Sequence, residues 1–78
     1  MTPVIVLSKP ACVQCTATYR KLTALGVPFE VRDVTQDDEA LALSKSLGYL
    51  QAPVVIAGSA HWSGYDPDRL GALVNSMA

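Results

Sequence analysis

The sequence is poor in cysteine, in histidine and in net charge. Its 78 residues include two cysteines and one histidine, and the formal net charge is −1. A chain with no excess of positive charge offers little attraction to a nucleic acid or an anionic membrane. The apolar run at residues 4–7 is far shorter than the roughly 20 residues that span a bilayer. We therefore expect neither a nucleic-acid-binding protein nor a membrane protein.

The sequence also shows no pattern of an export signal, and it has too few cysteines for a fold that depends on disulfides. No charged stretch followed by an apolar segment opens the sequence, so a cytoplasmic protein is expected. Stable disulfides are rare in that compartment. A bridge between Cys12 and Cys15 would close a very short loop, and the benefit of a disulfide grows with loop length. A purely structural disulfide is therefore the weakest interpretation of this pair.

A regular alternation of strand and helix patterns is what the sequence does contain. Half of its residues are hydrophobic, which suits a single globular domain over residues 1–78. The patterns predict strands at 4–7, 28–34, 53–56 and 61–63, with helices at 13–25, 35–47 and from 67 onward. Alternating strands and helices indicate parallel pairing with right-handed crossovers. The last two strands are too close for a crossover and should form a hairpin.

Local signals refine these elements. The first strand is short, continuous and apolar, which indicates burial on both faces of a sheet. Thr35 followed by Asp38 resembles a capping box at the start of the second helix, whose inward face should include Leu43. Asp66 ahead of Pro67 predicts the N-cap of the third helix.

Both cysteines lie at the predicted start of the first helix. Residues three apart share a helix face, so the sulfurs of Cys12 and Cys15 can meet. The free N–H groups of the first turn and the positive end of the helix dipole favour a thiolate at Cys12, and Lys9 adds positive charge nearby. Cys12 is expected to attack a disulfide and Cys15 to resolve the mixed disulfide. A C-x-x-C near a strand–helix–strand pattern in a cytosolic protein predicts a redox centre.

A metal site is the main alternative for the same two thiols. Two cysteines supply half of a tetrahedral zinc site, and the single histidine, His61, is far along the chain. A dimer could pool two pairs to hold zinc or an iron–sulfur cluster. The residues by themselves leave a dimeric metal carrier open beside the redox protein.

Three short stretches carry a resemblance to a known family. They read "CVQC" at residues 12–15, "QAPVV" at 51–55 and "WSGY" at 62–65. In this order and spacing they are similar to the NrdH-redoxins, glutaredoxin-like members of the thioredoxin superfamily, and the match covers nearly the whole chain. The resemblance implies an α/β thioredoxin fold of order βαβαββα, with a four-stranded mixed sheet flanked by three helices. It also implies a cis peptide bond between Ala52 and Pro53, which would present the Ala52 backbone to a substrate peptide.

The resemblance further implies an enzyme, a protein-disulfide reductase with no bound cofactor and no metal. NrdH-redoxins reduce the disulfide of class Ib ribonucleotide reductase, the enzyme of deoxyribonucleotide synthesis. They take electrons from NADPH through thioredoxin reductase and not from glutathione. The expected partners of this chain, a monomer by default, are therefore the large subunit of that ribonucleotide reductase and thioredoxin reductase.

The expected partner-binding surface surrounds Cys12. Its members, drawn from all three stretches and the loop before Cys12, are Lys9, Val13, Gln14, Ala52, Pro53, Trp62, Ser63, Gly64 and Tyr65. The family position of Trp62 favours a location on the surface near the cysteines.

One position departs from the family pattern, which commonly reads Trp-Ser-Gly-Phe-Arg in the third stretch. This chain has Tyr65 and Asp66 in place of the phenylalanine and the arginine. Glutaredoxins that bind glutathione often carry an aspartate near this point, where it holds the glutathione amino group. A glutathione-dependent glutaredoxin is therefore a second alternative, although a helix cap is a sufficient role for Asp66.

Overall fold

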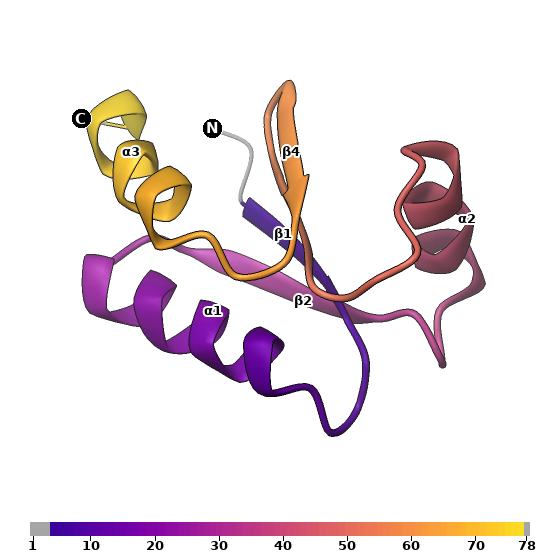
Figure 1. Ribbon diagram of the computed structural model, residues 1–78. Helices are drawn as coiled ribbons and strands as arrows, with labels where there is room; N and C mark the ends of the chain where they lie inside the picture. Colours follow the sequence, from indigo (N-terminus) through magenta and orange to yellow (C-terminus); the bar gives the residue numbers. More distant parts are fainter. Residues whose placement is uncertain (1–3, 78) are drawn as a thin grey trace.

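The computed structural model describes residues 4–77, and the side chains up to residue 74. All seven predicted elements are present, in the predicted order (Figure 1). They are β1 (Val4–Ser8), α1 (Val13–Leu25), β2 (Phe29–Asp33), α2 (Asp38–Ser46), β3 (Val54–Ala57), β4 (Ala60–Ser63) and α3 (Pro67–Met77). None of the helices in this part of the chain is long and apolar enough to cross a membrane.

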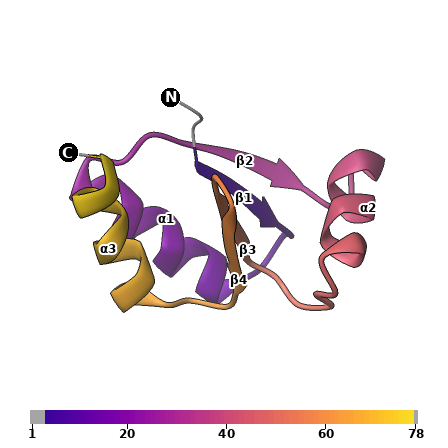
Figure 2. The same ribbon diagram turned by 90° about the horizontal axis from the view of Figure 1, so that it is seen from above.

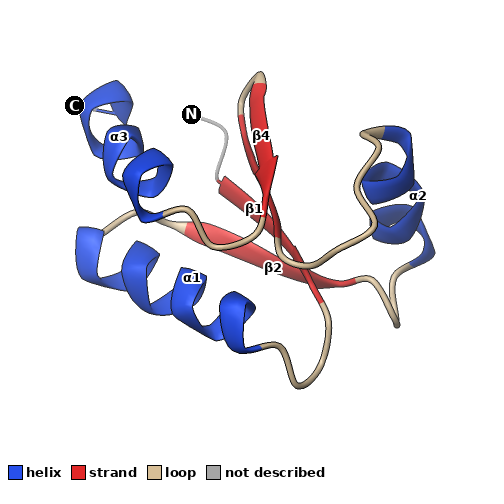
Figure 3. Cartoon of the chain, viewed as in Figure 1, coloured by secondary structure: helices blue, strands red, loops and turns tan. Residues whose placement is uncertain are grey.

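The four strands, which are red in Figure 3, form one mixed sheet in the order β2-β1-β3-β4. β1 is parallel to β2, and β3 and β4 form the expected antiparallel hairpin. Parallel pairing is wrong for β3, which runs antiparallel to β1. Since β3 starts at the end of the sheet where β2 stops, α2 does not carry the chain back along the sheet, as a crossover helix would.

Two apolar layers enclose the sheet, with α1 and α3 on one side and α2 on the other (Figure 2). β1 contributes to both layers, because Val6 packs with Leu22 and Leu70 on one face. On the other face Leu7 packs with Ala40, in the cluster next to α2. The prediction that this strand is buried on both faces is confirmed. It makes β1 a rigid base for the loop that leads to the cysteines.

The position of α1 is fixed at several points along its length. Leu22 and Thr18 are fully buried, and the Tyr19 hydroxyl is hydrogen-bonded to the hydroxyl of Ser8 at the end of β1. The helix ends at Gly26, which has a φ of 71° and donates its N–H to the Thr23 carbonyl at 3.1 Å. A left-handed glycine of this kind is a common helix stop, and the sequence predicted it.

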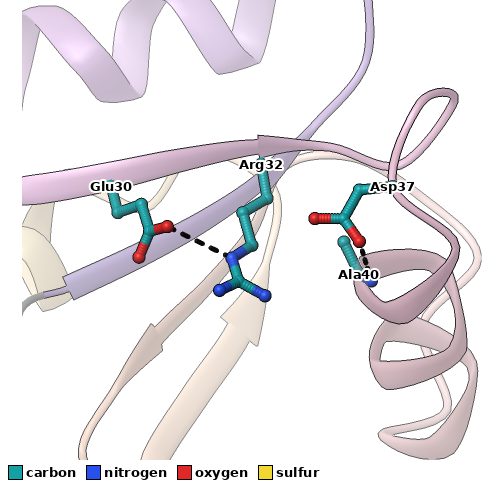
Figure 4. A network of polar contacts seen from close by, with 4 residues as sticks. All are labelled: Glu30, Arg32, Asp37 and Ala40. Carbon is teal, nitrogen blue, oxygen red and sulfur yellow. Dashed lines mark hydrogen bonds and ion pairs between the residues drawn. The ribbon is translucent and has the colours of Figure 1, made fainter.

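The start of α2 differs from the prediction. Its N-cap is Asp37, whose side chain accepts the Ala40 N–H at 3.1 Å (Figure 4). Thr35 does not cap the helix, because its N–H and its hydroxyl both donate to the Asp33 carboxylate, at 2.8 and 2.6 Å. With this later start, Ala40 and Ser44 face the sheet, and Leu43, which was expected to face inward, is 37% exposed.

The start of α3 agrees with the sequence. The Arg69 N–H donates to Oδ1 of Asp66 at 3.1 Å, and the Leu70 N–H donates to the Asp66 carbonyl at 3.1 Å. This geometry is that of a helix N-cap. The N-cap role predicted for Asp66 is confirmed.

A substitution in the α1 layer tests this packing. Leu22→Ala should lower the free energy of unfolding by about 2–5 kcal/mol, because it opens a cavity between α1 and the sheet. Leu50→Ala is the matched control, since Leu50 is 93% exposed and its loss should change stability by less than about 0.5 kcal/mol. Urea denaturation followed by circular dichroism measures both. Equal effects of the two substitutions would show that Leu22 is not a core residue.

Candidate active site

The two cysteines form a disulfide at the start of α1. Cys12 is the N-cap residue, with extended backbone angles, and Cys15 lies in the first helical turn. Their Cα atoms are 5.2 Å apart. Cys15 is only 1% exposed, whereas Cys12 is partly exposed. Cys12 is therefore the sulfur that an incoming thiolate or disulfide reaches first.

One backbone donor of the first helical turn contacts the Cys12 sulfur. The Cys15 N–H donates to Sγ of Cys12 at 3.1 Å, and the Thr16 N–H donates to the Cys12 carbonyl at 3.1 Å. These contacts place the sulfur at the positive end of the helix dipole. When the bridge is reduced, the same N–H group can stabilise a thiolate on Cys12.

The loop before α1 contains a backbone feature that the sequence did not predict. Ala11 has a φ of 56°, in the left-handed region that residues with a Cβ atom rarely adopt. It directly precedes Cys12. This turn brings the chain from the end of β1 to the helix N-terminus within the four residues that separate the two elements.

A shallow depression opens beside Cys12 and brings several expected site residues together. Besides Cys12 it is lined by Lys9, Ala11, Val13, Gln14, Leu50, Gln51 and Ala52. Val13 is 85% exposed, so it stands at the rim and is available to a partner. The peptide bond between Ala52 and Pro53 is cis, as the resemblance implied. Pro53 itself is fully buried behind Ala52.

Hydrogen bonds join the three stretches that carry the family resemblance. Oε1 of Gln14, between the cysteines, accepts the Tyr65 N–H at 3.0 Å. The neighbouring Gly64 N–H donates to the Pro53 carbonyl at 2.8 Å. Gly64 has a φ of 85°, and a Cβ atom there would lie 3.2 Å from the Gln14 oxygen. Glycine therefore suits this position both in backbone conformation and in space.

Two neighbouring residues of β4, Trp62 and Ser63, have different surroundings. Trp62 is only 7% exposed and packs in the core with Val55 and Leu70, so the expected surface location is wrong. Its side chain points toward the α1–α3 layer, with the Arg69 guanidinium 5.7 Å from the ring centroid. The Ser63 hydroxyl donates to the Gln51 carbonyl at 3.2 Å, which ties β4 to the loop before the cis-proline.

Tyr65 and His61 are not among the residues that line the Cys12 depression. Tyr65 is partly exposed and lines a second depression along α1, together with Val13. Nδ1 of His61 is 2.8 Å from the Tyr49 hydroxyl on the edge of the sheet. Across residues 4–77, no three His, Cys, Asp or Glu side chains gather into a metal-binding group.

Sequence analysis missed three residues that line the site. Leu50, Gln51 and Ala11 all border the depression that contains Cys12. Leu50 and Gln51 directly precede Ala52 and Pro53, and this adjacency was a usable signal. Ala11 had no signal, because an alanine in a left-handed conformation cannot be recognised from residue type.

The contact between Gln14 and Tyr65 can be tested by amide hydrogen exchange. Gln14→Ala removes the acceptor, so exchange of the Tyr65 N–H should accelerate about three- to tenfold, as expected for a bond of about 1 kcal/mol. Gln14→Glu keeps a side-chain oxygen and should retain most of the protection. Unchanged exchange in the alanine variant would mean that this hydrogen bond does not form in solution.

Known proteins resemble this chain in sequence and in structure. The glutaredoxin family model matches residues 4–62. The glutaredoxin-like protein NrdH of Escherichia coli strain K12 is 39% identical over 70 residues, which cover 90% of this chain and 86% of that protein. The Gene 56 protein of Mycobacterium phage L5 is 38% identical over 76 residues, covering 94% and 73%.

A solved structure supports the same assignment. The NrdH-redoxin from Escherichia coli, described as having a thioredoxin-like activity profile, superposes with a TM-score of 0.87 and 38% identity. The match covers 92% of this chain and 95% of that one. With the C-x-x-C pair at the start of α1, these findings confirm the expected fold and family. The chain belongs to the glutaredoxin family, as one of its NrdH-redoxin-like thiol–disulfide oxidoreductases.

Proposed function

We propose that this protein is a cytoplasmic dithiol electron donor for class Ib ribonucleotide reductase. In this proposal it acts as a monomeric single domain and reduces a disulfide of the large subunit. Thioredoxin reductase then restores its dithiol with electrons from NADPH. The single observation that carries the proposal is the Cys12–Cys15 bridge, with Cys12 accessible and Cys15 buried at a helix N-terminus. The similarity to NrdH proteins supports the choice of partners.

The reaction transfers two electrons through two disulfide exchanges. The Cys12 thiolate attacks one partner sulfur, so the partner S–S bond breaks and a mixed disulfide forms. The released partner sulfur takes up a proton. Cys15, having lost its proton, then attacks the Cys12 sulfur, which frees the second partner thiolate and leaves the Cys12–Cys15 disulfide. The second partner thiolate also takes up a proton from solvent, so the partner gains two electrons and two protons. This protein loses two electrons and the Cys15 proton, because Cys12 reacts as a thiolate.

The geometry supports this division of roles. A buried Cys15 is shielded from partner disulfides, yet its Cα lies 5.2 Å from that of Cys12, within reach for the second exchange. The Cys15 N–H, at 3.1 Å from the Cys12 sulfur, favours the thiolate that attacks in the first exchange. Cys12 is therefore proposed as the nucleophile and Cys15 as the resolving thiol.

The surroundings of Asp66 account for this residue without any contact to glutathione. Its Oδ1 caps α3 by accepting the Arg69 N–H. Its Oδ2 lies 3.3 Å from Nε of Arg69 in an ion pair. With both carboxylate oxygens engaged inside α3, Asp66 has a structural role that requires no glutathione amino group.

Substitution of each cysteine should separate the two steps. Cys15→Ser should accumulate a mixed disulfide with the ribonucleotide reductase large subunit, because the second exchange is blocked. Cys12→Ser should reduce disulfide turnover to background without unfolding the protein. Mass spectrometry under non-reducing conditions detects the adduct, and the double substitution is its control. Full activity of Cys12→Ser would contradict the proposed roles.

The electron source is tested by NADPH oxidation in two parallel assays. Both contain this protein and a disulfide substrate; one adds thioredoxin reductase, and the other adds glutathione with glutathione reductase. Turnover is expected only in the first assay. Turnover mainly in the second would replace the proposed recycling route with a glutathione-dependent one.

A further inference from the structure

Tyr49, in the connection from α2 to β3, joins the end of α2 to the edge strand β4. On the α2 side its N–H donates to the Ser44 carbonyl at 3.1 Å, and its carbonyl accepts the Ser44 hydroxyl at 3.2 Å. On the β4 side its hydroxyl is hydrogen-bonded to Nδ1 of His61 at 2.8 Å and donates to the His61 carbonyl at 3.3 Å. The two rings meet edge to face, with their centroids 5.6 Å apart. Tyr49 is therefore held from two directions.

The segment that follows Tyr49, residues 50–52, borders the Cys12 depression and has little packing of its own. Leu50 is 93% exposed, and Gln51 is also exposed. The position of such a segment depends mainly on polar contacts at its two ends. Tyr49 anchors the first end, and the Ser63 hydroxyl holds the second by donating to the Gln51 carbonyl at 3.2 Å.

Both contacts from β4 come from one face of the strand. His61 and Ser63 are two residues apart, so their side chains point to the same side of the sheet, and Trp62 between them points into the core. The His61 side chain is exposed and belongs to neither apolar cluster. Core packing therefore gives no role to His61, and its contact with Tyr49 acts on the segment at residues 50–52.

We propose that Tyr49 and His61 are positioning residues that hold residues 50–52 ready for a partner peptide, and so favour disulfides in polypeptides over small disulfides. A peptide that pairs with the Ala52 backbone loses less conformational entropy when that segment is already ordered. A small disulfide without peptide groups makes no such pairing and gains nothing from the order. This inference rests on the proposed function, since pairing with Ala52 brings the peptide disulfide to Cys12.

The test compares two substrates of the dithiol protein. One is a peptide with a single disulfide in a Cys-Gly-Ser-Cys sequence flanked by uncharged residues, and the other is bis(2-hydroxyethyl) disulfide. Acid quenching and chromatography give the second-order rate constant for each. Tyr49→Phe removes only the hydroxyl and keeps the ring that packs against the α2 layer. It should slow reduction of the peptide about two- to fivefold, as expected for one hydrogen bond, and leave the small disulfide unaffected.

A second substitution shows whether the two residues act through their contact. His61→Phe keeps a ring but removes Nδ1, and the Tyr49 hydroxyl can still donate to the backbone carbonyl of residue 61. Its effect on the peptide should therefore be no larger than that of Tyr49→Phe, and the double variant should match Tyr49→Phe alone. Ser59→Ala, in the turn of the same hairpin, is the control and should change neither rate. Urea denaturation checks that every variant is folded in the assay.

Other results would overturn the proposal in distinguishable ways. An unchanged peptide rate in Tyr49→Phe would show that the contact does not position the segment. An equal loss with both substrates would mean that the hydroxyl acts on the thiols or on the whole fold. Additive losses in the double variant would show that Tyr49 and His61 act separately. Reduction of neither disulfide by the unsubstituted protein would overturn the proposed function as well.

Discussion

The contact between the Cys15 N–H and Sγ of Cys12 is the interaction on which this site depends. It exists because Cys12 is the residue that caps α1, so its side chain returns to the first turn instead of pointing away. The helix start is in turn held by packing further along, where Leu22 is fully buried against the sheet. The placement of one helix N-terminus thus determines three features of the site. They are the accessible sulfur of Cys12, the Cys15 N–H that contacts it and the burial of the Cys15 side chain.

Around this contact, a small set of backbone hydrogen bonds unites distant parts of the chain. Gln14 binds the backbone of Tyr65, and Gly64 binds the backbone of Pro53. The cysteine turn, the cis-proline loop and the end of β4 therefore form one surface. Three of the four groups in these two bonds belong to the backbone, and the fourth is the side-chain oxygen of Gln14.

Charge is distributed unevenly over this surface. Asp66 and Arg69 form an ion pair at the start of α3, whereas the depression that includes Lys9 and Lys45 has no aspartate or glutamate among its lining residues. The net charge of the chain, −1, gives no indication of this local excess.

Local patterns in the sequence determined most of the fold and the centre of the site. The apolar run of β1, the stop at Gly26, the cap at Asp66 and the C-x-x-C pair all depend on neighbouring residues, and each prediction was confirmed in the structure. Only the tertiary structure decided the direction of β3 and the burial of Trp62. These depend on how α2 lies against the sheet and on which face of β4 meets the helices. Thr35 fails as a cap for a local reason, its bonds to Asp33 two residues earlier. The depression that Lys9, Lys45 and Leu50 line was likewise beyond the sequence, because these residues come together only when β1, α2 and the cis-proline loop are packed side by side.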